Sequence, residues 1–187
     1  MQLEATLTRN DVRTLVGQLA PLTIALGQKG QLTLAQPSEL ALVADRGLRV
    51  ICAAQVFWDL LGLSVPIALD SLAVMVAPSI EKRAEGDLLV FKMRIESADI
   101  VMVPSVIGDR LVDLVNAELA EKRVELSWAF GKTLSQVFCL PSVLQNLVSI
   151  GLAANSGSLR VTGDALVFSV SFGTEVERRP DNPDPSS

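Results

Sequence analysis

The sequence contains few side chains that could do chemistry, and it contains no histidine. This absence excludes a Ser-His-Asp triad, a cysteine nucleophile activated by histidine, and a histidine-ligated zinc ion. Cys52 and Cys139 are the only thiols, which is too few for a four-cysteine metal site within one chain. The opening residues do not have the pattern of a secretory signal peptide, so we expect two free thiols, with a disulfide as the alternative.

Carboxylates are the remaining candidates for a metal site or for acid–base chemistry. Glu81, Glu85 and Asp87 offer the oxygen atoms that hard cations prefer, but their spacing matches no known calcium loop and favours a solvated turn. Glu118 and Glu121 are expected on the polar side of a helix, where their pKa values would stay ordinary. The sequence has neither a GxxxxGK[ST] nor a GxGxxG phosphate loop. We therefore expect no enzyme activity, no metal and no cofactor.

Asp59 is the least ordinary carboxylate, because it lies within the most apolar region, in the run Val56-Phe57-Trp58-Asp59-Leu60-Leu61. A buried carboxylate must be paired or neutralised, so this residue could mark a site. A helix-turn cap or an exposed bend between strands is the interpretation we favour. The same region, residues 50–69, is too interrupted by polar residues for a transmembrane span, and we expect it to be buried core.

Two kinds of periodicity predict the elements that would position these residues. Alternation of apolar and polar residues predicts strands, and steps of three and four predict helices. Asn10 is the expected cap of the first helix, and Pro21 its end. The predicted strands are 2–8, 32–35, 39–44, 48–56, 65–76, 89–97, 124–129, 159–162 and 165–172, and the predicted helices follow residue 10, cover 104–122 and lie around 142–148.

This order predicts an α+β fold with antiparallel strands and segregated helices, in one domain over residues 1–173. The segment 89–97 is the clearest strand, because Leu89, Phe91, Met93, Ile95 and Ser97 face one way and charged residues face the other. Residues 174–187 contain three prolines and several charges, which predicts a disordered tail.

The composition favours handling of apolar surface. Apolar residues make up 49% of the chain and aromatic residues only 4%, with no tyrosine, so the apolar content is aliphatic. Such residues suit a filled core and would equally line a cavity for a hydrophobic ligand. The net charge is −5, and no basic run is present to neutralise phosphates, so we expect no nucleic-acid partner. With no transmembrane segment and no signal peptide expected, we predict a cytoplasmic protein.

The stretch from Ser64 to Leu119, with long aliphatic strands, a turn at Glu85-Gly86 and an amphipathic helix that starts at Pro104, resembles the tubular lipid-binding (TULIP) superfamily, which includes the bactericidal/permeability-increasing protein fold. The resemblance implies a twisted antiparallel sheet wrapped around a long amphipathic helix, with an apolar tunnel for acyl chains. Family members often join two such half-units, and this chain has the length of one, so a homodimer is expected.

The leading hypothesis is non-enzymatic binding of a lipid or another hydrophobic small molecule in an apolar groove. The alternative is an assembly or interaction module of the same fold, with a filled core and a homodimer interface. The residues predicted to line a groove come from two neighbouring strands and the long helix: Val65, Ile67, Leu69, Phe91, Met93, Ile95, Ile107, Leu111 and Leu114. A filled core would use the same residues, so their identity does not distinguish the two hypotheses.

Overall fold

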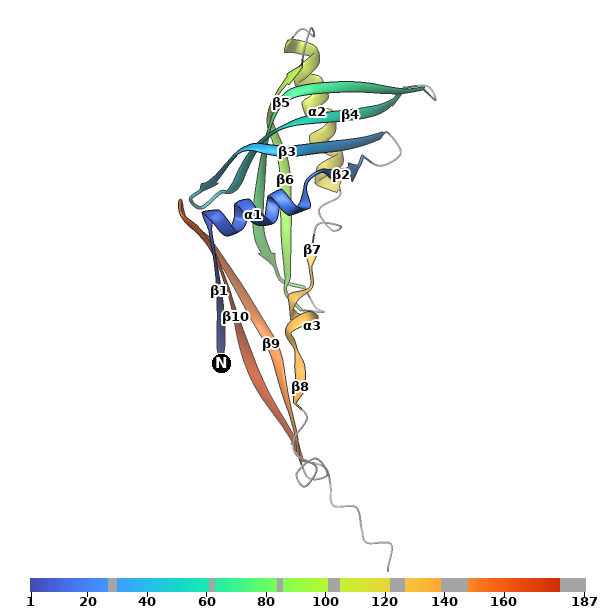
Figure 1. The fold of residues 1–187 in the computed structure, drawn as a ribbon. Helices are drawn as coiled ribbons and strands as arrows, with labels where there is room; N and C mark the ends of the chain where they lie inside the picture. The colour runs from blue at the N-terminus through green and yellow to red at the C-terminus, as the bar shows by residue number, and fades with distance from the viewer. Residues whose placement is uncertain are drawn as a thin grey trace, which may run out of the picture.

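The computed structural model describes residues 1–26, 30–60, 63–83, 86–100, 105–121, 127–138 and 148–178. Two antiparallel sheets make up most of this part of the molecule, and few helices accompany them (Figure 1). The upper sheet in the figure is strongly curled, and the lower sheet extends away from it as a long, narrow layer. The predicted antiparallel arrangement of the strands is confirmed, and the α+β organisation is matched in part, because strands dominate and helices are few.

The curled sheet has six strands in the order β2-β3-β4-β5-β6-β7, and the narrow sheet has four in the order β1-β10-β9-β8. In the curled sheet the strands are β2 (Leu22–Ala25), β3 (Gly30–Val43), β4 (Gly47–Leu60), β5 (Leu63–Glu81), β6 (Leu88–Ile100) and β7 (Ser127–Trp128). In the narrow sheet they are β1 (Gln2–Thr8), β8 (Gln136–Phe138), β9 (Val148–Val161) and β10 (Ala165–Arg178).

Three neighbouring ladders of the curled sheet lose their register at one level. The shifts lie between Leu34 and Pro37 on β3, between Cys52 and Ala54 on β4, and between Leu69 and Ser71 on β5. A bulge bends its strand and increases the local twist, so bulges aligned across adjacent strands bend the whole sheet. We call this line of irregularities the crease.

The tight hairpin predicted at Asp45-Arg46-Gly47 joins β3 and β4 as expected. Asp45 has a φ of 59° and Gly47 a φ of 136°. A Cβ atom at Gly47 would lie 2.2 Å from the carbonyl oxygen of Val76, so the position requires glycine for space as well as for conformation.

Helix α1 (Arg9–Leu19) is capped by Thr8 rather than by the predicted Asn10. The Thr8 hydroxyl accepts a hydrogen bond from the Asp11 backbone N–H, and the Asp11 carboxylate accepts one from the Thr8 N–H at 2.9 Å. This capping box satisfies two backbone donors at the helix start. The Thr8 hydroxyl also donates to the Asp11 carboxylate at 2.6 Å, and this bond, together with the bond from the Thr8 N–H, lowers the pKa of Asp11 below its ordinary value.

Helix α2 (Ser105–Glu121) confirms the helix predicted over 104–122 and packs against β6. The Asn116 side chain bonds both backbone groups of Ile95: its Oδ1 accepts from the N–H at 2.7 Å, and its Nδ2 donates to the carbonyl at 3.0 Å. Asn116 thereby satisfies the outward backbone groups of Ile95 at the β6 edge, whereas the described residues of β7 pair with Leu89 and Val90. A third, short helix, α3, covers Phe130–Leu134.

Buried side chains form three clusters. The first joins α2 to the inner face of the curled sheet and spans the crease, around Leu72, Val74, Val115 and Leu119. The second joins α1 to the curled sheet near the β3–β4 hairpin, around Val12, Leu40, Leu42, Leu48 and Val50. The third joins the two sheets through Leu89, Phe130 and Val170. The predicted sheet wrapped around one long helix is therefore only partly matched, because two helices occupy separate parts of the curled sheet.

The predicted disordered tail is wrong for its first residues. Thr174 to Arg178 continue strand β10 and pair with β9, where Val176 lies opposite Ile150. Strands β9 and β10 are long and directly connected, so their backbone hydrogen bonds continue along the pair even where no side chain packs in a core. Residues 179–187 and most of the short helix predicted around 142–148 lie outside the described residues, and Val148 begins β9. No helix in the described ranges is long and apolar enough to cross a membrane.

A candidate apolar binding cavity

The acidic candidates do not form a reactive centre in the part of the chain that the structure describes. The Glu81 carboxylate pairs with the Lys92 ammonium at 3.3 Å and lies 3.8 Å from the Arg83 guanidinium. Asp87 accepts a hydrogen bond from the Gly157 N–H at 3.3 Å. Glu85 lies outside the described residues, and no group of three potential metal ligands occurs among those described.

Glu118 is a correction to the sequence analysis. It is buried rather than on the wet side of α2, whereas Glu121 is exposed as predicted. Glu118 follows Leu111 by seven residues and Val115 by three, so the helical period brings it to the face that packs on the sheet. Asp59 lies in β4 opposite Ser64 near the end of the β4–β5 hairpin, and its side chain is outside the described part.

The crease and α1 enclose an apolar cavity of about 340 Å³. We call it the α1 cavity. Every residue that lines it is apolar, and these residues come from the end of α1, from β2 and from four adjacent strands of the curled sheet. They are Val16, Leu19, Ala20, Leu22, Leu34, Ala35, Pro37, Leu48, Val50, Cys52, Val74, Val76, Phe91 and Met93.

The two helices leave part of the inner face uncovered. Helices α1 and α2 pack in separate clusters, and the α2 cluster spans the crease, since it contains both Leu34 and Cys52. Leu34 and Pro37 flank the shift on β3, and Cys52 lies beside the shift on β4. All three line the cavity. The aligned bulges therefore position the cavity as well as bending the sheet.

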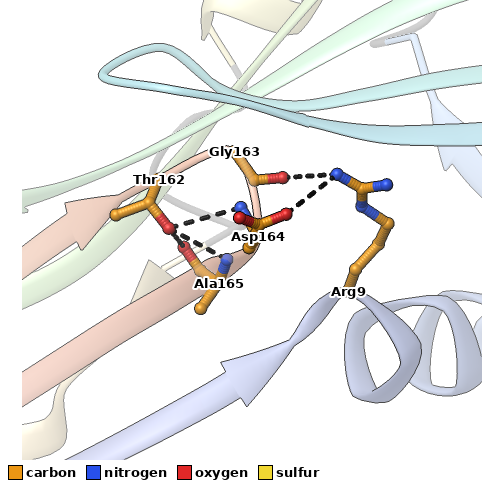
Figure 2. Close-up of polar contacts among 5 residues, drawn as sticks. All are labelled: Arg9, Thr162, Gly163, Asp164 and Ala165. Carbon is orange, nitrogen blue, oxygen red and sulfur yellow. Dashed lines mark hydrogen bonds and ion pairs between the residues drawn. The ribbon is translucent and has the colours of Figure 1, made fainter.

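The first turn of α1 is tied to the turn between β9 and β10. The Arg9 guanidinium donates to the Gly163 carbonyl oxygen at 2.7 Å and pairs with the Asp164 carboxylate at 3.3 Å (Figure 2). The Thr162 hydroxyl fixes that turn by accepting from the Asp164 and Ala165 N–H groups. At the other end of α1, Leu19 lines the cavity and is 66% exposed, so the cavity meets solvent there.

The lining of the cavity runs across four strands, from β3 to β6, and three inter-strand spacings amount to about 14 Å. It also runs along β4 from Leu48 to Cys52, about 13 Å at the rise of a strand. The cavity therefore extends about as far along the strands as across them.

The sequence placed the groove at α2, and the structure places the cavity at α1. Of the nine predicted residues, only Phe91 and Met93 line it. Ile67, Leu69, Ile95 and Leu111 instead belong to the packed cluster beneath α2, and Leu114 is 48% exposed. The side chains of Val65 and Ile107 lie outside the described part.

Sequence reasoning missed the contributions of α1, β3 and β4. The spacing of Val12, Leu15, Val16 and Leu19 at steps of three and four was the available signal, because an amphipathic helix must cover apolar surface. What that face covers depends on how the sheet bends, and register shifts leave no clear mark in an alternating pattern.

Cys52 gives this cavity a chemical reporter. It is 1% exposed, and burial raises the pKa of its thiol. In a Cys139→Ser background, we expect methyl methanethiosulfonate to modify Cys52 slowly at pH 7, and faster as the pH rises through and beyond 9, since only the thiolate reacts. An apolar ligand in the cavity should slow the reaction further, as measured by intact-protein mass spectrometry. Fast modification that an apolar ligand does not change would contradict this placement.

Comparisons with known proteins give one similarity to describe. A crystal structure of lipopolysaccharide binding protein matches with a TM-score of 0.42 and 13% sequence identity, over 98% of this chain and 52% of that chain. The present chain thus spans about half the length of that protein. No family model matches the sequence, and no curated protein does.

Proposed function

We propose that this protein binds one hydrocarbon chain of a lipid, or a similarly narrow hydrophobic ligand, in the α1 cavity and catalyses no reaction. The observation that carries the proposal is the cavity itself: about 340 Å³ lined only by apolar residues. Ligand sites in proteins typically measure roughly 300–1,000 Å³, so this volume lies at the lower end of the range. If no ligand binds there, a cavity of this kind only lowers the stability of the folded protein.

The lining also determines which part of a ligand enters. An apolar chain gains about 0.8 kcal/mol for each CH₂ group that it buries, so a chain of several carbons supplies useful affinity. A polar head group gains nothing inside, because the lining offers no side chain to pair with it. The head group therefore stays at the open end near Leu19, and the site selects the chain.

The alternative, an interaction module with a filled core, draws its support from the α2 side. Leu72, Val115 and Leu119 are each at most 1% exposed, so the region where the sequence placed a groove is closely packed. The two proposals differ in what happens at α1: a module needs no ligand there, whereas a carrier does.

A thermal titration tests the proposal. We expect 1-dodecanol to raise the melting temperature saturably, because it binds only the folded state, and 1-butanol at equal concentration to have little effect. At a ligand concentration of about a hundred times Kd, the stabilisation is about 2.7 kcal/mol. For a chain of this size that corresponds to a rise of roughly 5–10 °C. The absence of any rise, together with native mass spectra of gently purified protein that show no bound lipid, would reject the carrier in favour of the module.

A further inference from the structure

Strand β1 forms an open edge of the narrow sheet. Among the residues that the structure describes, it pairs only with β10, and every β1 residue except Leu7 is exposed. In Figure 1 it borders the lower sheet, and α1 leads from its end toward the upper sheet. An unpaired edge of this length is a template for another strand.

The edge carries few of the usual devices that prevent pairing, and Glu4 is its one charged side chain. The segment QLEATLT contains no proline and no lysine, and its pairing with β10 has no bulge. Met1 and Phe172 exchange both backbone hydrogen bonds, at 2.7 and 3.1 Å. By the alternation of an antiparallel ladder, odd-numbered β1 residues bond to β10, and the backbone groups of Gln2, Glu4 and Thr6 point outward.

We propose that β1 pairs antiparallel with β1 of a second copy of this chain, about a two-fold axis at Ala5. This register places Glu4 opposite Thr6 of the second copy, where the two exchange ladder hydrogen bonds. It also places Leu3 opposite Leu7 of the second copy. Leu3 is 52% exposed in the single chain, so this contact covers apolar surface that is otherwise in water.

Charge selects this register over its neighbour. An axis at Glu4 would set the two Glu4 carboxylates directly opposite each other, and like charges there are destabilising. The axis at Ala5 avoids this repulsion, and the two narrow sheets then form one continuous sheet. The proposal does not depend on any ligand in the α1 cavity.

Two substitutions of the exposed Thr6 form a matched test. The positive charge introduced by Thr6→Lys would face Glu4 of the second copy and should tighten the dimer. The negative charge introduced by Thr6→Glu would face the same carboxylate and should weaken it. Each change acts at both symmetry-related places, so the dissociation constant should shift by between about twofold and thirtyfold in opposite directions. Light scattering from about 1 to 100 µM would follow the conversion of a 20.0 kDa chain to a particle of twice that mass. A chain that stays monomeric at 100 µM, or a dimer that responds equally to both changes, overturns the proposal.

Cross-linking tests the register separately. In a background without Cys52 and Cys139, Ala5→Cys should form a disulfide across the two-fold axis under mild oxidation, since Cα atoms of such a pair lie about 4.5 Å apart. Leu3→Cys serves as the matched control, because it faces Leu7 rather than its own copy. Cross-linking through Leu3→Cys and not through Ala5→Cys overturns the register.

Discussion

Replacing Val76 with phenylalanine is expected to abolish ligand binding and leave the protein folded. Val76 lines the α1 cavity and is only partly buried, so the larger ring can enter empty space. The added carbons occupy the volume that a hydrocarbon chain would use, so the affinity for dodecanol should fall at least tenfold. The melting temperature of the unliganded protein should hold or rise, because the ring fills a cavity.

Leu111→Phe is the matched control. Leu111 packs against the buried cluster beneath α2 and does not line the α1 cavity, so an added ring there must displace its neighbours. Forcing added volume into a packed core typically costs 1–3 kcal/mol, so this variant should unfold at lower urea concentration while binding dodecanol as before. Equilibrium unfolding and ligand titration on the two variants give opposite patterns. If Val76→Phe is strongly destabilised or still binds the ligand, the cavity is not the site.

The sequence predicted best those elements in which apolar residues recur at one clear spacing. The alternation in residues 89–97 correctly put Leu89, Phe91, Met93 and Ile95 on the inner face. Ser97 departs from it, because a register shift intervenes and leaves this residue exposed. Local periodicity therefore identifies the faces of a strand up to the first bulge and not beyond it.

The location of the cavity could not be predicted in the same way. Cys52 and Val74 line the cavity and also belong to the packed cluster beneath α2, so cavity and core share one apolar pattern. What separates them is the shape of the sheet, which depends on register shifts in three successive strand pairs. Leu114 shows the same limit on α2, because it belongs to the apolar period of the helix and is nevertheless 48% exposed.

Replacing Phe130 with alanine should give the largest loss of stability. Phe130 is 1% exposed and packs in the cluster that joins the two sheets. Its ring lies edge-on to Phe168, with centroids 5.2 Å apart, and meets Trp128 at 6.2 Å. Removing a buried phenylalanine side chain typically costs about 3–5 kcal/mol, and here the hole would open between the sheets. Urea unfolding monitored by Trp128 fluorescence in a Trp58→Phe background measures this loss.

The contact between Phe130 and Gly157 allows a second test of how Phe130 packs at the junction of the two sheets. A Cβ atom at Gly157 would lie 2.5 Å from Cζ of Phe130, so Gly157→Ala forces the ring to shift and should destabilise the protein. In a Phe130→Leu background the ring is absent, and Gly157→Ala should cost much less. We expect a coupling free energy within about 0.5–3 kcal/mol from the double-mutant cycle. Equal costs in the two backgrounds would show that Phe130 does not close the junction of the two sheets at Gly157.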